Sequence, residues 1–212
     1  MNKDFKLWDG SVVDLVTNSS GVKVVDGSAD ITTSGVFSYI KNCYDRLLTD
    51  YLTKEDEIDI IHLGCGMGYD LLYVDHLFKY KNININKLVG IDLTDYKDIM
   101  VDTGLFNFPI EFYRIDVMEY LNSITLDNNL NKKVVVFIDL FLKGNSPIEL
   151  VYDKKLWTNI VDSINPTYII VNRCSGNCTL DSIKDSINFK HYDKWSYSLE
   201  FYELKIGDTE DE

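Results

Sequence analysis

Hydrophobic and polar residues change their spacing several times along the chain, and each change predicts a different element. Residues 58–64, IDIIHLG, form a short apolar run that is typical of a buried strand. The segment 69–80, YDLLYVDHLFKY, has the apolar spacing of a helix, and 87–93, KLVGIDL, is strand-like again. Because strands and helices alternate in this way, the sequence predicts a parallel sheet with right-handed crossovers.

The same alternation continues toward the C-terminus. Strand-like runs and helix-like segments follow one another at 111–117, 118–124, 134–140, 149–164 and 167–173. The last stretch, 187–207, has alternating aromatic residues and predicts two further strands, paired antiparallel at one edge of the sheet. We therefore expect an α/β fold with a Rossmann-like sheet that is mostly parallel and has an antiparallel C-terminal edge.

Two short runs rich in valine lie near the N-terminus, SVVDLVT at 11–17 and GVKVVDG at 21–27. The residues between them are typical of a turn, so this region predicts a small β-hairpin. Residues 35–52 carry apolar side chains at helical spacing, and this helix leads into the main sheet. We accordingly divide the chain into a hairpin region, 1–34, and a Rossmann-like domain, 35–212.

The composition is that of an ordinary globular protein, since 212 residues with 45% hydrophobic content fit one main domain. No apolar run approaches the roughly 20 residues that a membrane span requires. The first residues lack the pattern of a signal peptide, and the four cysteines show no dense disulfide spacing. These features predict a protein of the reducing cytoplasm with no membrane partner.

The net charge of −13 comes from 34 acidic against 21 basic residues. Nucleic-acid binders usually carry a basic stripe that neutralises phosphates, and the sequence has no such stripe. We therefore expect no nucleic-acid partner. A cationic or neutral small molecule suits this negative field better.

Three glycines, Gly64, Gly66 and Gly68, lie between the first predicted strand of the sheet and its helix. Glycines at this point let the backbone turn sharply and let a ligand approach without meeting a side chain. They predict a nucleotide-binding turn. The alternative is a tight strand-to-helix turn that holds no ligand.

Acidic residues end the strands that follow. Asp92 comes about two dozen residues after the last glycine, where a carboxylate can accept both hydroxyl hydrogens of a ribose. Asp116 and Asp139 end the next two strand-like runs. Ligands of open α/β sheets lie outside the carboxyl ends of the strands, so we expect these acids and the glycine turn to converge on one crevice. Asp116 has an alternative role as the cap of the helix that follows it.

The glycine turn reads GCGMGYD at 64–70, which differs from the GxGxxG turn of dinucleotide sites and puts Asp70 near the helix N-terminus. It resembles the GxGxG turn of class I S-adenosylmethionine-dependent methyltransferases. The resemblance implies S-adenosylmethionine as cofactor, a nucleoside that has no phosphate and carries a positive sulfonium, and it implies no metal. The residues expected at this cofactor are Gly64, Cys65, Gly66, Gly68, Asp92, Leu93, Asp116 and Val117.

A closer resemblance begins ahead of the glycine turn, in the segment 21–39. The matching residues, without a gap, are Gly21, Asp26, Gly27, Phe37 and Tyr39. The chain thus resembles the spermidine synthases and related aminopropyltransferases over about residues 11–175. This branch of the superfamily implies decarboxylated S-adenosylmethionine and a polyamine as substrates, and a homodimer formed through the hairpin.

The departures from that family lie at the residues that bind its substrates. Asp30 stands where the family usually has a glutamine that contacts the nucleoside. The family's active-site loop is D-x-x-D-P, whereas here Asp139 is followed by Leu142 and Lys143 in place of the second acid and the proline. A leucine cannot hold an ammonium group, so we expect an altered aminopropyl pocket.

We therefore expect an S-adenosylmethionine-dependent methyltransferase that acts on a small-molecule acceptor. Asp139 would supply the acid or base, and Tyr39 would contribute to the pocket. Two alternatives stay open. One is an aminopropyltransferase with an unusual amine pocket, and the other is a catalytically inactive protein of this fold that acts in binding or regulation.

Other chemically interesting residues are interpreted as structural. His62 lies in the first strand of the sheet, where many methyltransferases carry an acid, and we expect it to be buried or to face a loop, with a backbone partner. Cys174 and Cys178 lack the second ligand pair that a zinc site needs. The aromatic residues of 192–202 and Trp157 are interpreted as packing residues of the sheet and of a helix.

Overall fold

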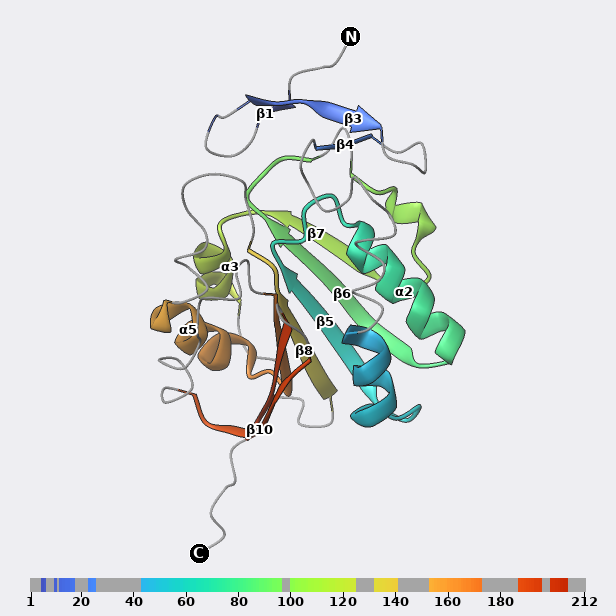
Figure 1. Ribbon diagram of the computed structural model, residues 1–212, viewed down its shortest axis with the longest axis vertical. Helices are drawn as coiled ribbons and strands as arrows, with labels where there is room; N and C mark the ends of the chain where they lie inside the picture. The colour runs from blue at the N-terminus through green and yellow to red at the C-terminus, as the bar shows by residue number, and fades with distance from the viewer. Residues whose placement is uncertain are drawn as a thin grey trace, which may run out of the picture.

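A seven-stranded sheet forms the centre of the molecule (Figure 1). The computed structural model describes residues 5–6, 10, 12–17, 23–25, 43–96, 100–124, 132–140, 153–172, 187–195 and 199–205. The strands of the sheet lie in the order β10-β11-β9-β8-β5-β6-β7. Their bounds are β5 Glu57–Leu63, β6 Asn84–Asp92, β7 Ile110–Arg114, β8 Lys132–Ile138, β9 Tyr168–Asn172, β10 Phe189–Lys194 and β11 Leu199–Leu204.

Helices cover both faces of this sheet. On one face lie α2 (Tyr69–Lys81) and the helical residues 43–50, and on the other face α3 (Val117–Ser123) packs beside α5 (Lys154–Ile164). A short 3₁₀ helix, η2 (Thr103–Leu105), precedes β7. This arrangement confirms the predicted α/β, Rossmann-like fold. The helix predicted at 35–52 is described only from residue 43 and ends at 50, because a turn follows it.

The central strands are apolar along most of their length because both of their faces are covered. In β5, Ile58 and Ile60 pack on the α2 side, whereas Ile61 and Leu63 pack on the side of α3 and α5. The strand β5 pairs in parallel with β6 on one flank and with β8 on the other. The carboxyl ends of these three strands therefore meet at one edge of the sheet.

The C-terminal strands form the predicted antiparallel edge, but their order in the sheet differs from their order in the chain. The last strand, β11, does not extend the sheet outward but inserts between β9 and β10 and runs antiparallel to both. The predicted aromatic packing is confirmed, since Trp195 stacks on Phe201 with ring centroids 4.5 Å apart. The hydroxyls of Tyr192 and Tyr202 both donate to the buried carboxylate of Glu200. Trp157 is fully buried in α5.

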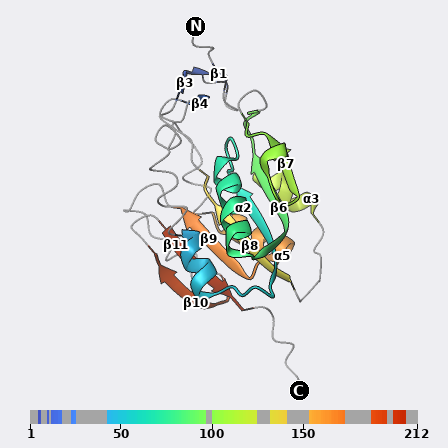
Figure 2. The same ribbon diagram turned by 90° about the vertical axis from the view of Figure 1, so that its right-hand side faces the viewer.

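The predicted N-terminal hairpin is present as β3 (Leu15–Thr17) paired antiparallel with β4 (Lys23–Val25). A second antiparallel pair joins β1 (Phe5–Lys6) to β2 (Val12–Val13), so the run predicted as one strand at 11–17 is divided at Asp14. In two views these strands lie at the end of the molecule opposite β10 (Figures 1 and 2).

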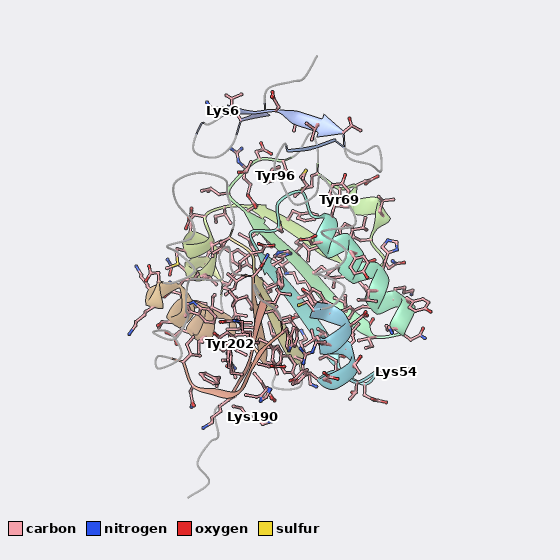
Figure 3. The ribbon with its side chains drawn as sticks, viewed as in Figure 1. Lys6, Lys54, Tyr69, Tyr96, Lys190 and Tyr202 are labelled. Atoms are coloured by element: carbon pink, nitrogen blue, oxygen red, sulfur yellow. The ribbon has the colours of Figure 1, made fainter. Side chains whose placement is uncertain are left out.

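The hairpin packs directly over the glycine turn. Leu15 and Val16 of β3 contact a small apolar cluster formed by Met67 and Tyr96. Tyr69 belongs to the same cluster, and Figure 3 shows Tyr69 and Tyr96 between the sheet and the hairpin. The division at residue 34 stays a prediction, but this contact ties the hairpin to the main domain. None of the described helices is long and apolar enough to cross a membrane.

Candidate functional site

The glycine turn links β5 to α2 at the carboxyl edge of the sheet. Gly64, Gly66 and Gly68 all have positive φ, at 84°, 52° and 85°. The backbone N–H groups of Gly64 and Cys65 both donate to the carbonyl oxygen of Ile91, at 2.8 and 3.1 Å. The turn is thereby fixed against the end of β6, next to Asp92.

The three glycines are required for different reasons. A Cβ atom on Gly64 would lie 2.1 Å from the carbonyl oxygen of Asp139, and one on Gly68 would lie 2.7 Å from the ring of Phe112. Packing within the protein therefore explains both of these glycines. A Cβ atom on Gly66 would meet nothing within 4 Å among the described residues. In this part of the chain no side chain or backbone atom therefore covers that face of Gly66, which is where a ligand could approach.

Asp92 is held beside this open face by backbone donors. Its Oδ2 accepts from the N–H of Gly66 at 3.0 Å, and its Oδ1 accepts from the N–H of Thr94 at 2.8 Å. Burial raises the pKa of the Asp92 carboxyl, although hydrogen bonds from Thr94, Gly66 and Leu93 oppose the shift. The fold therefore orients the carboxylate. Burying it in its ionised form without hydrogen-bond partners would cost free energy.

Two apolar or weakly polar residues border the same carboxylate. Leu93 keeps 37% of its surface exposed, which is unusual for a large hydrophobic residue at the end of a central strand. Cys65 is buried in the turn, and burial together with the carboxylates of Asp92 and Asp70 raises the pKa of its thiol. Cys65 is therefore a neutral packing residue, and its contribution to a ligand site would come from the backbone.

Asp116 has the helix-capping role that was the alternative interpretation. Its Oδ1 accepts from the N–H groups of Met118 and Glu119, at 2.8 and 3.2 Å, at the start of α3. The side chain of Val117 is buried in the core, so a contact with a ligand would use its backbone N–H. The N–H of Ile115 donates to the carbonyl oxygen of Asp92, which brings this loop to the same edge of the sheet.

Asp139 follows β8 and lies against the glycine turn. Its backbone N–H donates to Leu63 at 2.9 Å, and its Oδ1 accepts from Nδ2 of Asn172 at 3.3 Å. The expected convergence of Asp92, Asp116 and Asp139 around the glycine turn is thus what the backbone contacts produce. Tyr39, the other predicted catalytic residue, lies outside the described residues.

His62 differs from the expectation for a structural histidine. It is 2% exposed, as expected, and its ring packs edge-on against Phe137 with centroids 4.7 Å apart. Its Nε2, however, has no hydrogen-bond partner within the described part of the chain. Burial lowers the pKa of His62 to about 3, so the ring is neutral.

The structure brings His62 together with two acids. One ring nitrogen of His62 and one carboxylate oxygen each of Asp70 and Asp139 lie within 4.8 Å of one another. The sequence did not predict this cluster, because its members come from β5, α2 and the end of β8. The one available signal was the histidine at a position where many methyltransferases carry an acid.

The fold of this chain is similar to that of several proteins of known structure. The chain is similar to MnmC2 from Aquifex aeolicus, with a TM-score of 0.55 and 14% identity over 90% of this chain and 69% of that protein. It is also similar to the DszA carbon methyltransferase, with a TM-score of 0.50 and 9% identity over 84% of this chain and 55% of that one. The chain has a class I methyltransferase fold. No protein-family model and no curated protein sequence matches it.

These similarities in fold do not distinguish an aminopropyltransferase from a methyltransferase. The residues that separate an aminopropyltransferase from a methyltransferase, Asp30, Leu142 and Lys143, lie outside the described residues, as do Cys174 and Cys178. The resemblance to spermidine synthases, and the homodimer that it implies, therefore stay predictions.

Proposed function

We propose that the chain is an S-adenosylmethionine-dependent methyltransferase that acts on a small molecule. The observation that carries this proposal is the open face of Gly66 beside the fixed carboxylate of Asp92. Packing accounts for the neighbouring glycines, whereas none of the described residues approaches the Cβ position of Gly66 at the carboxyl edge of the sheet. The fold supports the same proposal.

The residues at this edge fit a nucleoside. Asp92 would accept hydrogen bonds from the ribose hydroxyls, since its carboxylate is already oriented by backbone donors. The exposed side chain of Leu93 would pack against the face of the base. The backbone of Gly66 would allow the sugar and its substituent to approach without a clash. None of these contacts requires a phosphate.

The acceptor would bind on the β8 side of the glycine turn, where Asp139 lies. S-adenosylmethionine supplies a methyl group on a positive sulfonium, which leaves a neutral thioether when the methyl is transferred. In that transfer a lone pair of the acceptor forms the new bond to carbon and the carbon–sulfur bond breaks. Asp139 would take up the proton that the acceptor loses, and the surrounding fold would hold the acceptor in line with the methyl group.

A small acceptor fits the surroundings better than a nucleic acid. The chain carries a net charge of −13, which repels a phosphate backbone. The hairpin would also cover part of the site, because Leu15 and Val16 pack on the cluster that Met67 of the glycine turn forms with Tyr96. Access to the site is thereby narrowed on the hairpin side.

The test combines ligand identification with binding. Mass spectrometry of the freshly purified protein would identify any nucleoside that copurifies. Isothermal titration would then compare S-adenosylmethionine, S-adenosylhomocysteine and decarboxylated S-adenosylmethionine. We expect the two carboxylated ligands to bind and Asp92→Ala to weaken both by at least roughly tenfold, or about 1.4 kcal/mol. Asp162→Asn, on the exposed face of α5, serves as the matched control.

Transfer itself is measured with S-adenosylmethionine labelled in the methyl group. Small-molecule extracts and macromolecular fractions would be offered separately as acceptors. Label that appears in the small-molecule fraction supports the proposal. Failure of all three nucleosides to bind would refute it, and turnover of decarboxylated S-adenosylmethionine with a polyamine would replace it with the aminopropyltransferase alternative.

A further inference from the structure

The cluster of His62, Asp70 and Asp139 lies beside the glycine turn at the carboxyl edge of the sheet, on the side where the proposed function places the acceptor. His62 pairs with Phe137 in the register between β5 and β8, and Asp139 follows β8 directly. Asp70 lies in the first turn of α2, immediately after the glycine turn. Three separate elements therefore present one potential ligand atom each to the same small volume.

The buried imidazole distinguishes this cluster from an ordinary group of surface acids. His62 is 2% exposed, and its Nε2 has no hydrogen-bond partner among the described residues. A second buried polar atom nearby, the hydroxyl of Tyr44, is in the same condition, and the Asp70 carboxylate contributes to its raised pKa. Native proteins seldom leave such atoms without a partner unless an ion, water or ligand completes the site.

The donor set matches a divalent transition metal. A neutral imidazole and two carboxylates are ligands that zinc, manganese and iron share, whereas magnesium prefers oxygen alone. Zinc–nitrogen and zinc–oxygen bonds are about 2.0–2.2 Å long, so two ligand atoms of a tetrahedral site lie roughly 3.3–3.6 Å apart. The ligand atoms here lie within 4.8 Å of one another, and side-chain shifts of up to roughly an ångström would bring them onto one ion.

We propose that His62, Asp70 and Asp139 bind one divalent transition-metal ion at the acceptor end of the crevice. Two contacts hold the ligands in place: the edge-on packing of His62 on Phe137, and the hydrogen bond from Asn172 to Asp139. Three protein ligands leave a coordination position for the acceptor. The ion would lower the pKa of an acceptor hydroxyl bound to it, so that the proton passes to solvent water. With the metal bound, Asp139 would be a ligand, and it would no longer serve as the base that the proposed function assigns to it in the absence of a metal.

This inference deepens the proposed function, but its test needs no nucleoside. Isothermal titration of the metal-free protein would be carried out with Zn²⁺, Mn²⁺ and Mg²⁺, and Co²⁺ would report the ligand geometry through its visible absorption. We expect one equivalent of Zn²⁺ to bind, Mg²⁺ to bind much more weakly, and bound ion to raise the melting temperature. A failure here would leave the nucleoside site of Gly66 and Asp92 unaffected.

Variants separate the cluster from adventitious surface binding. The chain has three histidines, and the other two, His76 and His191, are exposed. We expect His62→Leu and Asp139→Asn each to weaken Zn²⁺ binding by at least about tenfold and to remove the Co²⁺ spectrum. The double variant His76→Gln/His191→Gln should bind like the original protein. Loss of binding in the double variant alone would overturn the proposal.

Stability in the absence of metal provides a further check. Because Nε2 of His62 has no hydrogen-bond partner in the part of the chain that the structure describes, His62→Leu should leave the metal-free protein at least as stable as the original. If His62 had a purely structural role, its replacement by leucine would instead destabilise the metal-free protein. Clear destabilisation of metal-free His62→Leu, together with unchanged Zn²⁺ binding by Asp139→Asn, would show that the cluster is structural.

Discussion

The backbone N–H of Gly66 donates to Oδ2 of Asp92 over 3.0 Å, which joins the glycine turn to the end of the neighbouring strand β6. The contact has two effects. It fixes the carboxylate that would receive the ribose, and it keeps the turn in a conformation in which no described residue approaches the Cβ position of Gly66. Geometry of the turn and orientation of the acid are therefore coupled, so a change at either residue should affect nucleoside binding.

The first prediction concerns pH. Burial raises the pKa of Asp92 above its ordinary value of 3.8, so the folded state favours the protonated acid. The stability gained in this way is fully present below pH 3.8 and is lost as the pH rises through the raised pKa. Nucleoside affinity should rise over the same range, because the ionised carboxylate accepts hydroxyl hydrogen bonds more strongly.

Urea unfolding and titration calorimetry between about pH 4 and pH 7 would measure both trends. Asp92→Asn removes the titrating group, so the free energy of unfolding and the nucleoside affinity should both change less with pH over this range. If the original protein and Asp92→Asn show parallel pH profiles, the carboxyl of Asp92 is not responsible for either trend.

The second prediction compares two glycines of the same turn. Gly66→Ala introduces the strain of a positive φ, about 1–2 kcal/mol, and its Cβ meets no atom of the described residues within 4 Å. Gly64→Ala adds a collision with the carbonyl oxygen of Asp139 and should cost several kcal/mol in the free energy of unfolding. Denaturant unfolding measures both. Gly66→Ala should stay folded and still lose nucleoside affinity, and an unchanged affinity would count against a ligand at its open face.

The third prediction separates the capping role of Asp116 from a role in binding. Asp116 caps α3 and Asp153 caps α5 in the same way, through backbone N–H groups of the first turn. Replacement of either acid by alanine should lower stability by about 0.5–2 kcal/mol. Only Asp116→Ala should also weaken nucleoside binding, because it is Asp116 that follows β7 at the crevice. Equal binding by the two variants would restrict Asp116 to its structural role.

The fourth prediction concerns the hairpin over the glycine turn. Val16 is half-buried against the cluster of Met67 and Tyr96, whereas Val12 of the neighbouring strand is 59% exposed. Val16→Ser should loosen the hairpin and speed hydrogen exchange in β3, while Val12→Ser should have little effect. Nucleoside dissociation, followed by stopped flow, should become faster only in Val16→Ser. Slower or equal dissociation would mean that the hairpin does not restrict the site.

Local patterns predicted the fold well because each strand and helix depends on the spacing of apolar residues that are close together in the chain. The apolar run of β5 and the helical spacing of α2 need no knowledge of distant segments. The placement of β11 between β9 and β10 was not predicted, since two alternating strands have the same local pattern in either order. Strand order is decided by pairing between distant residues, which a single sequence does not record.

The candidate site shows the same division. Asp92 and the glycines were predicted because their spacing follows from one strand–turn–helix unit and the next strand. The cluster of His62, Asp70 and Asp139 was missed, because it arises only when β8 lies beside β5. Its clearest sign is a buried nitrogen that has no hydrogen-bond partner among the described residues, which is a property of three-dimensional packing.

The insertion of β11 also constrains the order of events during synthesis. The strands β9 and β10 leave the ribosome first, yet neither pairs with the other in the finished sheet, and each has β11 as a neighbour. One edge of β9 therefore has no paired strand until β11 leaves the ribosome. A chain that stalled shortly before β11 would already contain the glycine turn and Asp92 on a sheet with an unpaired edge, a form that chaperones and proteases could distinguish from the finished protein.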